Sequence, residues 1–162
     1  MTTDATGSPE PAPAAPAKSS RRRDCRSTAM QFIYMWDMNP SEDRAGVLAN
    51  FFNTQEHPRD YYSFAEELIV GTLDHQAEID ELIKKSAHNW AFNRIARVDL
   101  AILRLGIFEL LHRRDIPPVV TINEAIELGK AFSNDDSRRF LNGILDKVKD
   151  SLGRPSRTAA ES

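Results

Sequence analysis

Residues 98–113 constrain the fold most, because they form a helix pattern with almost no polar face. A helix that is hydrophobic all round is normally buried inside a protein. The double proline at Pro117 and Pro118 would end such a helix. The segment is therefore predicted to be a central helix against which the rest of the chain packs. Its apolar residues are Leu100, Ala101, Ile102, Leu103, Leu105, Ile107, Phe108, Leu110 and Leu111.

The segments on either side carry amphipathic patterns, with apolar residues recurring every three or four positions. These patterns predict helices over residues 24–38, 43–53, 60–73 and 75–86, and a short turn near residues 90–92. After the double proline, Thr121 and Glu124 match a capping box, which predicts that another helix starts there. A last helix is predicted to begin near residues 135–137, with Gly143 in its middle indicating close contact with another helix. No strand-like alternation persists, so the predicted fold class is all-α, with about six or seven helices around one or two cores.

The two ends of the chain differ from its body. Residues 1–20 are rich in proline and alanine and are predicted to be a disordered tail, as are residues 153–162. Residues 21–152 are predicted to form one helical domain. No apolar run approaches the length of a membrane span, and the N-terminus lacks the apolar core of a secretory signal. With Cys25 as the single cysteine, these features predict a cytoplasmic protein without disulfides or membrane contact.

Motifs for catalysis are missing from the sequence. There is no phosphate-binding loop, no dinucleotide fingerprint and no nucleophile elbow. The four histidines lack the spacing of a zinc site and are interpreted as surface residues. They are His57, His75, His88 and His112. We therefore expect a binding protein with no cofactor rather than an enzyme.

A concentrated basic segment indicates an anionic partner. Residues 18–26 carry five basic side chains against Asp24 alone, although the whole chain has a net charge of −3. Arginine binds phosphate bidentately and stacks on bases, which favours RNA, although a solvated basic linker explains the same spacing. Tyr34 lies off the apolar stripe of its helix and is either a platform for a base or a tyrosine at the edge of the core. The candidate RNA-binding arginines are Arg21, Arg22, Arg23 and Arg26.

The turn before the last helix contains residues 134–137, NDDS. These residue types cap helices, yet a second carboxylate such as Asp136 would remain available to a partner. Positive charge follows on the helix at Arg138, Arg139 and Lys147, where a solvated face is the simplest interpretation.

Taken together, these segments resemble the NusB family of transcription antitermination factors. Residues 29–36, AMQFIYMW, are similar to the family's A-x-Q-x-L-Y-x-W, and residues 97–104, RVDLAILR, are similar to its V-[ED]-x-A-[IV]-L-R. The strongest block is residues 122–128, INEAIEL, followed by Asp136-Ser137, Phe140 and Asn142-Gly143. The resemblance covers roughly residues 21–149 and departs from the family at Asp24, where another basic residue is common.

The resemblance implies an all-α fold of two small packed helical bundles and an RNA-binding antitermination function. The implied partners are single-stranded boxA-type RNA in nascent ribosomal transcripts, the small-subunit ribosomal protein NusE, and the RNA polymerase antitermination complex. It implies phosphate contacts from Arg22, Arg23 and Arg26. It also implies that Arg138 and Phe140 lie near the RNA and that Tyr34, Asp99 and Asp136 lie at the RNA or partner surface. Some members form homodimers that bury the arginines, and both states stay open here.

Two other functions remain open at this point. NusB-like domains also precede ribosomal RNA cytosine methyltransferases, so the chain could belong to ribosomal RNA methylation or processing. A protein-interaction module with incidental arginines is the other alternative. RNA binding, alone and with NusE, discriminates between these hypotheses.

Overall fold

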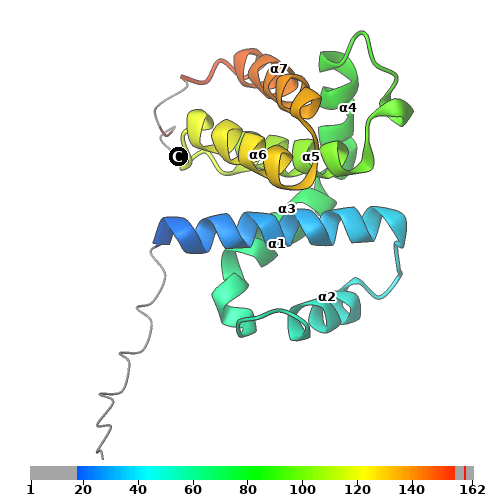
Figure 1. Ribbon diagram of the computed structural model, residues 1–162, viewed down its shortest axis with the longest axis vertical. Coiled ribbons are helices and arrows are strands. Elements are labelled where there is room, and N and C mark those ends of the chain that lie inside the picture. Colours follow the sequence, from blue (N-terminus) through cyan, green and yellow to red (C-terminus); the bar gives the residue numbers. More distant parts are fainter. Residues whose placement is uncertain (1–17, 156–158, 160–162) are drawn as a thin grey trace, which may run out of the picture.

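The computed structural model describes residues 18–155 and residue 159, and the regular secondary structure of these residues is helical, with loops and turns between the helices (Figure 1). No strand occurs among them, which confirms the all-α prediction. The α-helices are α1 (Lys18–Met38), α2 (Arg44–Asn53), α3 (Ser63–Asp74), α4 (Gln76–Ser86), α5 (Arg97–His112), α6 (Pro118–Phe132) and α7 (Asp135–Ser151). Two 3-10 turns, η1 (Arg59–Tyr62) and η2 (Phe92–Arg94), join them.

Helix α5 is the central helix that its sequence predicted. Every residue from 99 to 110 is buried, and α5 packs against α1, α3, α4, α6 and α7. Figure 1 shows α2 on one side of α1 and α4, α5, α6 and α7 on the other, with α3 crossing behind α1. Because α5 contacts α1 and α3 as well as α4, α6 and α7, it joins two small helical bundles through one continuous hydrophobic core. None of the helices within residues 18–155 is long and apolar enough to cross a membrane.

Close approaches between helices lie at other glycines, Gly106 and Gly129 among them, rather than at the predicted Gly143. A Cβ atom added to Gly106 would stand 3.2 Å from Leu145 Cδ2, so α5 and α7 pack tightly there. The same test at Gly129 places Leu141 Cδ1 only 2.9 Å away. Around Gly143 there is open space and the residue is exposed, so the prediction for Gly143 was wrong.

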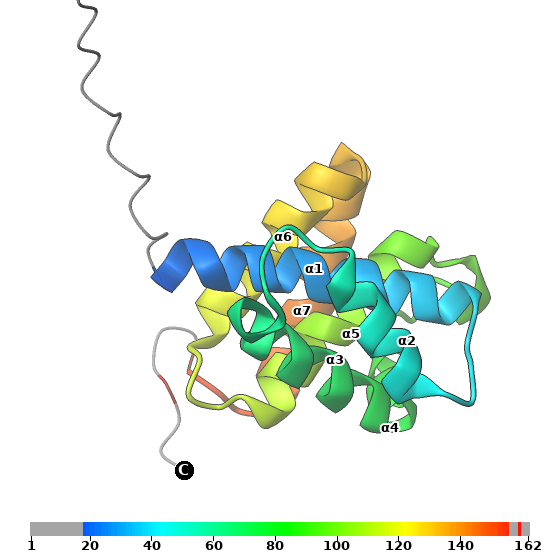
Figure 2. The same ribbon diagram turned by 90° about the horizontal axis from the view of Figure 1, so that it is seen from below.

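Helix α1 begins at Lys18, six residues before the predicted start at 24, so the arginines belong to its first turns. Side-chain contacts hold this extension in place: Arg21 Nη2 donates to the carbonyl of Asp60 at 2.7 Å, and Arg21 Nε donates to that of Tyr61 at 2.8 Å. Figure 2 shows α1 running lengthwise along the molecule. The arginines are therefore presented by a folded helix rather than by a flexible junction. The disordered tail was predicted over residues 1–20, but residues 18–20 belong to α1, and residues 1–17 lie outside the described residues.

Helix α6 begins at Pro118, earlier than the predicted capping box. Proline suits the first turn of a helix because its missing N–H would have no partner there. Thr121 lies inside the helix and donates from Oγ1 to Glu109 Oε1 at 3.3 Å, and Glu124 pairs with an arginine of α1. The capping box was therefore a wrong prediction, since tertiary contacts use both side chains. At the next turn, Asn134 caps α7 as expected by accepting from the backbone N–H of Ser137 at 3.1 Å.

The chain after α7 stays packed for several residues. Gly153 adopts a left-handed conformation with φ of 64°, which turns the chain back toward α5. The Arg154 guanidinium is then buried and donates to the carbonyls of Leu110, Arg114 and Ile116 at 3.1, 3.0 and 3.2 Å. The disorder predicted from residue 153 onward is therefore wrong for residues 153–155. Residues 156–158 and 160–162 lie outside the described part of the chain.

Candidate nucleic-acid interface

The first turns of α1 present a cationic surface. The Arg22 guanidinium lies 4.8 Å from the ring centroid of Phe64, and it forms no ion pair within residues 18–155. Arg23 bonds Glu124 of α6 with both Nε and Nη2, at 3.1 and 3.0 Å, yet its side chain stays 63% exposed. The hydrogen bond and charge of Glu124 raise the pKa of Arg23, so this guanidinium is cationic at any physiological pH. Both side chains are thus oriented by neighbours while remaining open to an anion.

Arg26 differs from the three arginines before it. Its side chain is only 4% exposed, and its guanidinium donates to both carboxylate oxygens of Glu109. Those bonds occupy the fork that a phosphate would need. The predicted phosphate contact of Arg26 therefore requires correction: in this fold Arg26 joins α1 to α5 in the interior.

Tyr34 extends the arginine surface along α1. Residues 23 and 34 lie eleven positions apart, which is close to three helical turns, so Arg23 and Tyr34 share one face about 16 Å apart. Tyr34 is 37% exposed. One turn later Asp37 pairs with Arg97 at the start of α5, at 2.7 Å. A polar, partly aromatic surface thus runs from the start of α1 toward the start of α5.

A pocket lies at the far end of this surface, between the start of α5, η2 and α7. Trp90 and Phe140 form one wall, with ring centroids 5.7 Å apart in an edge-to-face arrangement. Trp90 is 57% exposed, and Arg94 lines the same pocket. In the sequence, Trp90 marks only a predicted turn, and no pattern singles out Arg94. A tryptophan in a short polar connection was the available signal, but only the fold brings it against Phe140.

The two predicted acidic residues meet at this pocket, in different settings. Asp99 is buried, and its oxygens accept from the hydroxyls of Ser133 at 3.0 Å and Ser137 at 2.9 Å. It therefore supports the floor of the pocket and the turn between α6 and α7, rather than lying at the partner surface as the resemblance implied. Asp136, in the first turn of α7, is exposed and lines the pocket rim.

Basic residues of α7 lie beside the pocket. Arg138 pairs loosely with Asp135 at 3.6 Å, and its side chain is 42% exposed. Arg139 is exposed and flanks Phe140 on a neighbouring shallow depression. The predicted RNA-binding residues thus divide into an arginine group at the start of α1 and an aromatic–basic group at the start of α7, with Tyr34 between them along the α1 face.

Two other titratable groups near the start of α1, Cys25 and Tyr61, take part in packing and hydrogen bonding within the fold. The Cys25 thiol is fully buried, and burial raises its pKa. Tyr61 donates from its hydroxyl to Asp24 Oδ2 at 2.6 Å, and this hydrogen bond raises the pKa of Tyr61 to about 12. Asp24, which departs from the family pattern, therefore accepts a hydrogen bond from a tyrosine of η1 rather than pairing with the neighbouring arginines.

Comparisons with known proteins agree with these features. The sequence profile of the NusB family matches residues 23–150. The transcription antitermination protein NusB of Myxococcus xanthus (strain DK1622) is 42% identical over 137 residues, covering 83% of this chain and 98% of that protein. The same-named protein of Geotalea uraniireducens (strain Rf4) is 44% identical over 137 residues, covering 80% and 94%.

Solved structures give the same result. A structure of T. maritima NusB superposes with a TM-score of 0.72 at 31% identity, covering 86% of this chain and 93% of that one. A chain from a crystal structure of the antitermination factors NusB and NusE in complex with dsRNA gives 0.70 at 25% identity, covering 81% and 97%. The fold, the matched residues and the identity over most of the chain place this protein in the NusB family.

Proposed function

We propose that this protein is an RNA-binding transcription antitermination factor that binds boxA-type sequences of nascent ribosomal RNA together with NusE. The observation that carries the proposal is the arginine group at the start of α1, in which Arg21 and Arg23 are exposed and Arg22 is half-buried, in a chain similar to one solved in a NusB–NusE complex with RNA. Its task is binding, by which it couples the RNA to the RNA polymerase antitermination complex.

In this proposal Arg22 and Arg23 bind RNA phosphates, with Arg21 beside them. A guanidinium can donate to two phosphate oxygens at once, and the helix fixes the positions of the two guanidinium groups. Glu124 holds Arg23 in place. The Arg23 side chain is 63% exposed while that of Glu124 is 17% exposed, so a phosphate can approach the guanidinium from solvent without displacing Glu124. Arg26 contributes through position alone, by fixing α1 on α5.

The aromatic–basic group is proposed to contact the bases and the protein partner. Stacking on aromatic rings is the usual way in which proteins hold unpaired bases, and Phe140 and Trp90 offer such rings beside Arg94. Arg138, two residues before Phe140, lines a separate depression and would add positive charge nearby. Tyr34 serves the RNA or NusE along the α1 face. Asp136 at the pocket rim is proposed to face NusE.

The test is a fluorescence-anisotropy titration of a short boxA-like RNA against a scrambled RNA, with and without purified NusE. We expect tighter binding to boxA, improved by NusE. Arg22→Ala combined with Arg23→Ala should weaken binding at every salt concentration and reduce the salt slope by about one per lost phosphate contact.

Arg44→Ala is the matched control, because Arg44 forms a comparable exposed ion pair with Asp74 on the α2–α3 side of the molecule. It should leave RNA affinity unchanged. Equal and weak binding to both RNAs, unaffected by NusE, would contradict the proposal and favour a protein-interaction module.

A further inference from the structure

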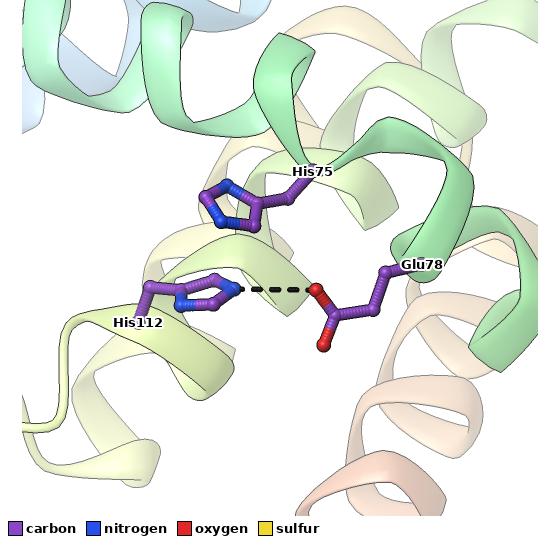
Figure 3. A group of neighbouring side chains, drawn as sticks. All are labelled: His75, Glu78 and His112. Atoms are coloured by element: carbon purple, nitrogen blue, oxygen red, sulfur yellow. Dashed lines mark ion pairs between the residues drawn. The ribbon is translucent and has the colours of Figure 1, made fainter.

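Two histidines and a glutamate meet where three helices end or begin. His75 is the junction residue between α3 and α4, Glu78 lies in the first turn of α4, and His112 is the last residue of α5 (Figure 3). The sequence pattern predicts scattered surface residues for both histidines, because they lie far apart along the chain. The fold brings one ligand atom from each of the three side chains to within 4.8 Å of the others.

The separation between Glu78 and His112 suits a shared metal ion better than a hydrogen bond. Glu78 Oε2 and His112 Nε2 lie 3.5 Å apart, whereas an N–H···O bond is usually about 2.9 Å long. Zinc holds nitrogen and oxygen ligands at about 2.0–2.2 Å, so two ligands of a tetrahedral site lie roughly 3.4 Å apart. These two atoms therefore already have the spacing of neighbouring ligands.

His75 carries the secondary contact that metal-binding histidines usually make. Its Nδ1 lies 2.8 Å from the carbonyl oxygen of Gly71, and since a carbonyl only accepts, Nδ1 is the protonated nitrogen. The lone pair of the neutral ring is then on Nε2, where it can bind a metal. The His75 ring also packs against the His112 ring, with 3.9 Å between their centroids. The Phe108 ring contacts both imidazoles.

The surroundings suit an ion that enters from solvent. The His112 side chain is 34% exposed and that of Glu78 is 52% exposed. Two imidazoles and one carboxylate form a ligand set typical of zinc, and three protein ligands leave a fourth position for water. None of the three residues belongs to the proposed RNA surface.

We propose that His75, Glu78 and His112 form a binding site for a divalent transition-metal ion, with Zn²⁺ the best match. The ion would clamp the α3–α4 junction to the end of α5. Since the three ligands come together only in the folded chain, the metal would stabilise the native state by an amount that grows with the logarithm of its free concentration once that exceeds the dissociation constant. The site would be structural, and RNA binding would not depend on its occupancy.

The experiment is isothermal titration calorimetry of untagged, chelator-treated protein with Zn²⁺. A separate titration with Co²⁺, followed by visible absorption, reports the coordination geometry. We expect one ion per chain, a tetrahedral Co²⁺ spectrum and a raised melting temperature with Zn²⁺. His112→Gln and Glu78→Gln should each weaken Zn²⁺ binding about tenfold or more, since even residues behind a ligand have effects of that size.

His88→Gln is the matched control, because His88 is an exposed histidine outside the cluster. It should bind Zn²⁺ like the unaltered protein. Circular dichroism confirms that each variant is folded, and both ligand variants alter exposed side chains. No zinc binding, or equal binding by His112→Gln, Glu78→Gln and the control, would overturn the proposal and reduce the contact to an ordinary Glu78–His112 ion pair.

Discussion

The guanidinium of Arg26 and the carboxylate of Glu109 form a bidentate ion pair in the interior, with N–O distances of 2.8–3.2 Å. Their side chains are 4% and 2% exposed. Because α1 supplies the arginine and α5 the glutamate, the pair fixes the helix that presents Arg22 and Arg23. Arg26, a residue of the basic segment, thus positions the proposed RNA surface from the interior of the protein.

Removing one member of this pair should destabilise the protein strongly. Arg26→Ala leaves Glu109 buried without its partner, and breaking a buried ion pair costs about 3–5 kcal/mol. Urea unfolding followed by circular dichroism measures this loss. Arg23→Ala is the control and should cost less, about 1 kcal/mol, because the Arg23 side chain is 63% exposed and Glu124, at 17%, keeps some contact with solvent. An Arg26→Ala protein of normal stability that no longer binds RNA would instead assign Arg26 a direct phosphate contact.

The aromatic wall of the pocket should contribute to RNA affinity without affecting the fold. Base stacking on an aromatic side chain is worth about 1–3 kcal/mol, so Trp90→Ala should weaken boxA binding roughly 5- to 150-fold. Anisotropy with and without NusE separates an RNA contact from a partner contact. Phe132→Ala is the control, since Phe132 is an exposed aromatic residue that does not line the pocket. Equal RNA affinity of the unaltered protein, Trp90→Ala and Phe132→Ala would show that Trp90 is not part of the proposed RNA surface.

Cys25 should be slow to react with thiol reagents in the native protein. The thiolate is the reactive species, and burial both raises the pKa of Cys25 and excludes the reagent. Labelling with a chromogenic disulfide at mildly alkaline pH should therefore proceed only as fast as the chain opens, and should become rapid in denaturant. Fast labelling of the folded protein would show that the first turns of α1 detach from η1.

Arg154 should stabilise the end of the domain. Its guanidinium donates to three carbonyls of α5 and the following loop, so Arg154→Ala leaves those groups without donors and should cost about 1–3 kcal/mol. Arg154→Lys should recover little, because a single ammonium does not reproduce the planar fork. Lys147→Ala, which removes one exposed contact with Ser86, is the control for urea unfolding. Full stability of Arg154→Ala would show that residues 153–155 contribute nothing to the domain.

Local sequence pattern accounts for much of the fold. The apolar spacing of residues 98–113 identified the buried central helix, since burial on all sides leaves no polar face. The start of α7 was also predictable, because Asn134 caps it through a contact within the same turn. Family motifs spread along the chain were enough to indicate an RNA-binding role.

The predictions that failed depend on contacts between residues distant in sequence. The first turns of α1 are held by the η1 turn through Arg21, and the side chains expected to cap α6 bond α1 and α5 instead. Likewise, neither residue type nor spacing distinguishes the buried Arg26 from the exposed Arg23. Their different burial depends on Glu109 and Glu124, the distant carboxylates with which they pair.

The sequence by itself therefore determined the helices, the central position of α5 and the family. The tertiary structure decided which charged side chains are buried with a partner and which remain available to a ligand. It also decided that His75, Glu78 and His112 meet at all. The physical reason is that helix periodicity is a property of neighbouring residues, whereas burial and ion pairing depend on which helices pack together.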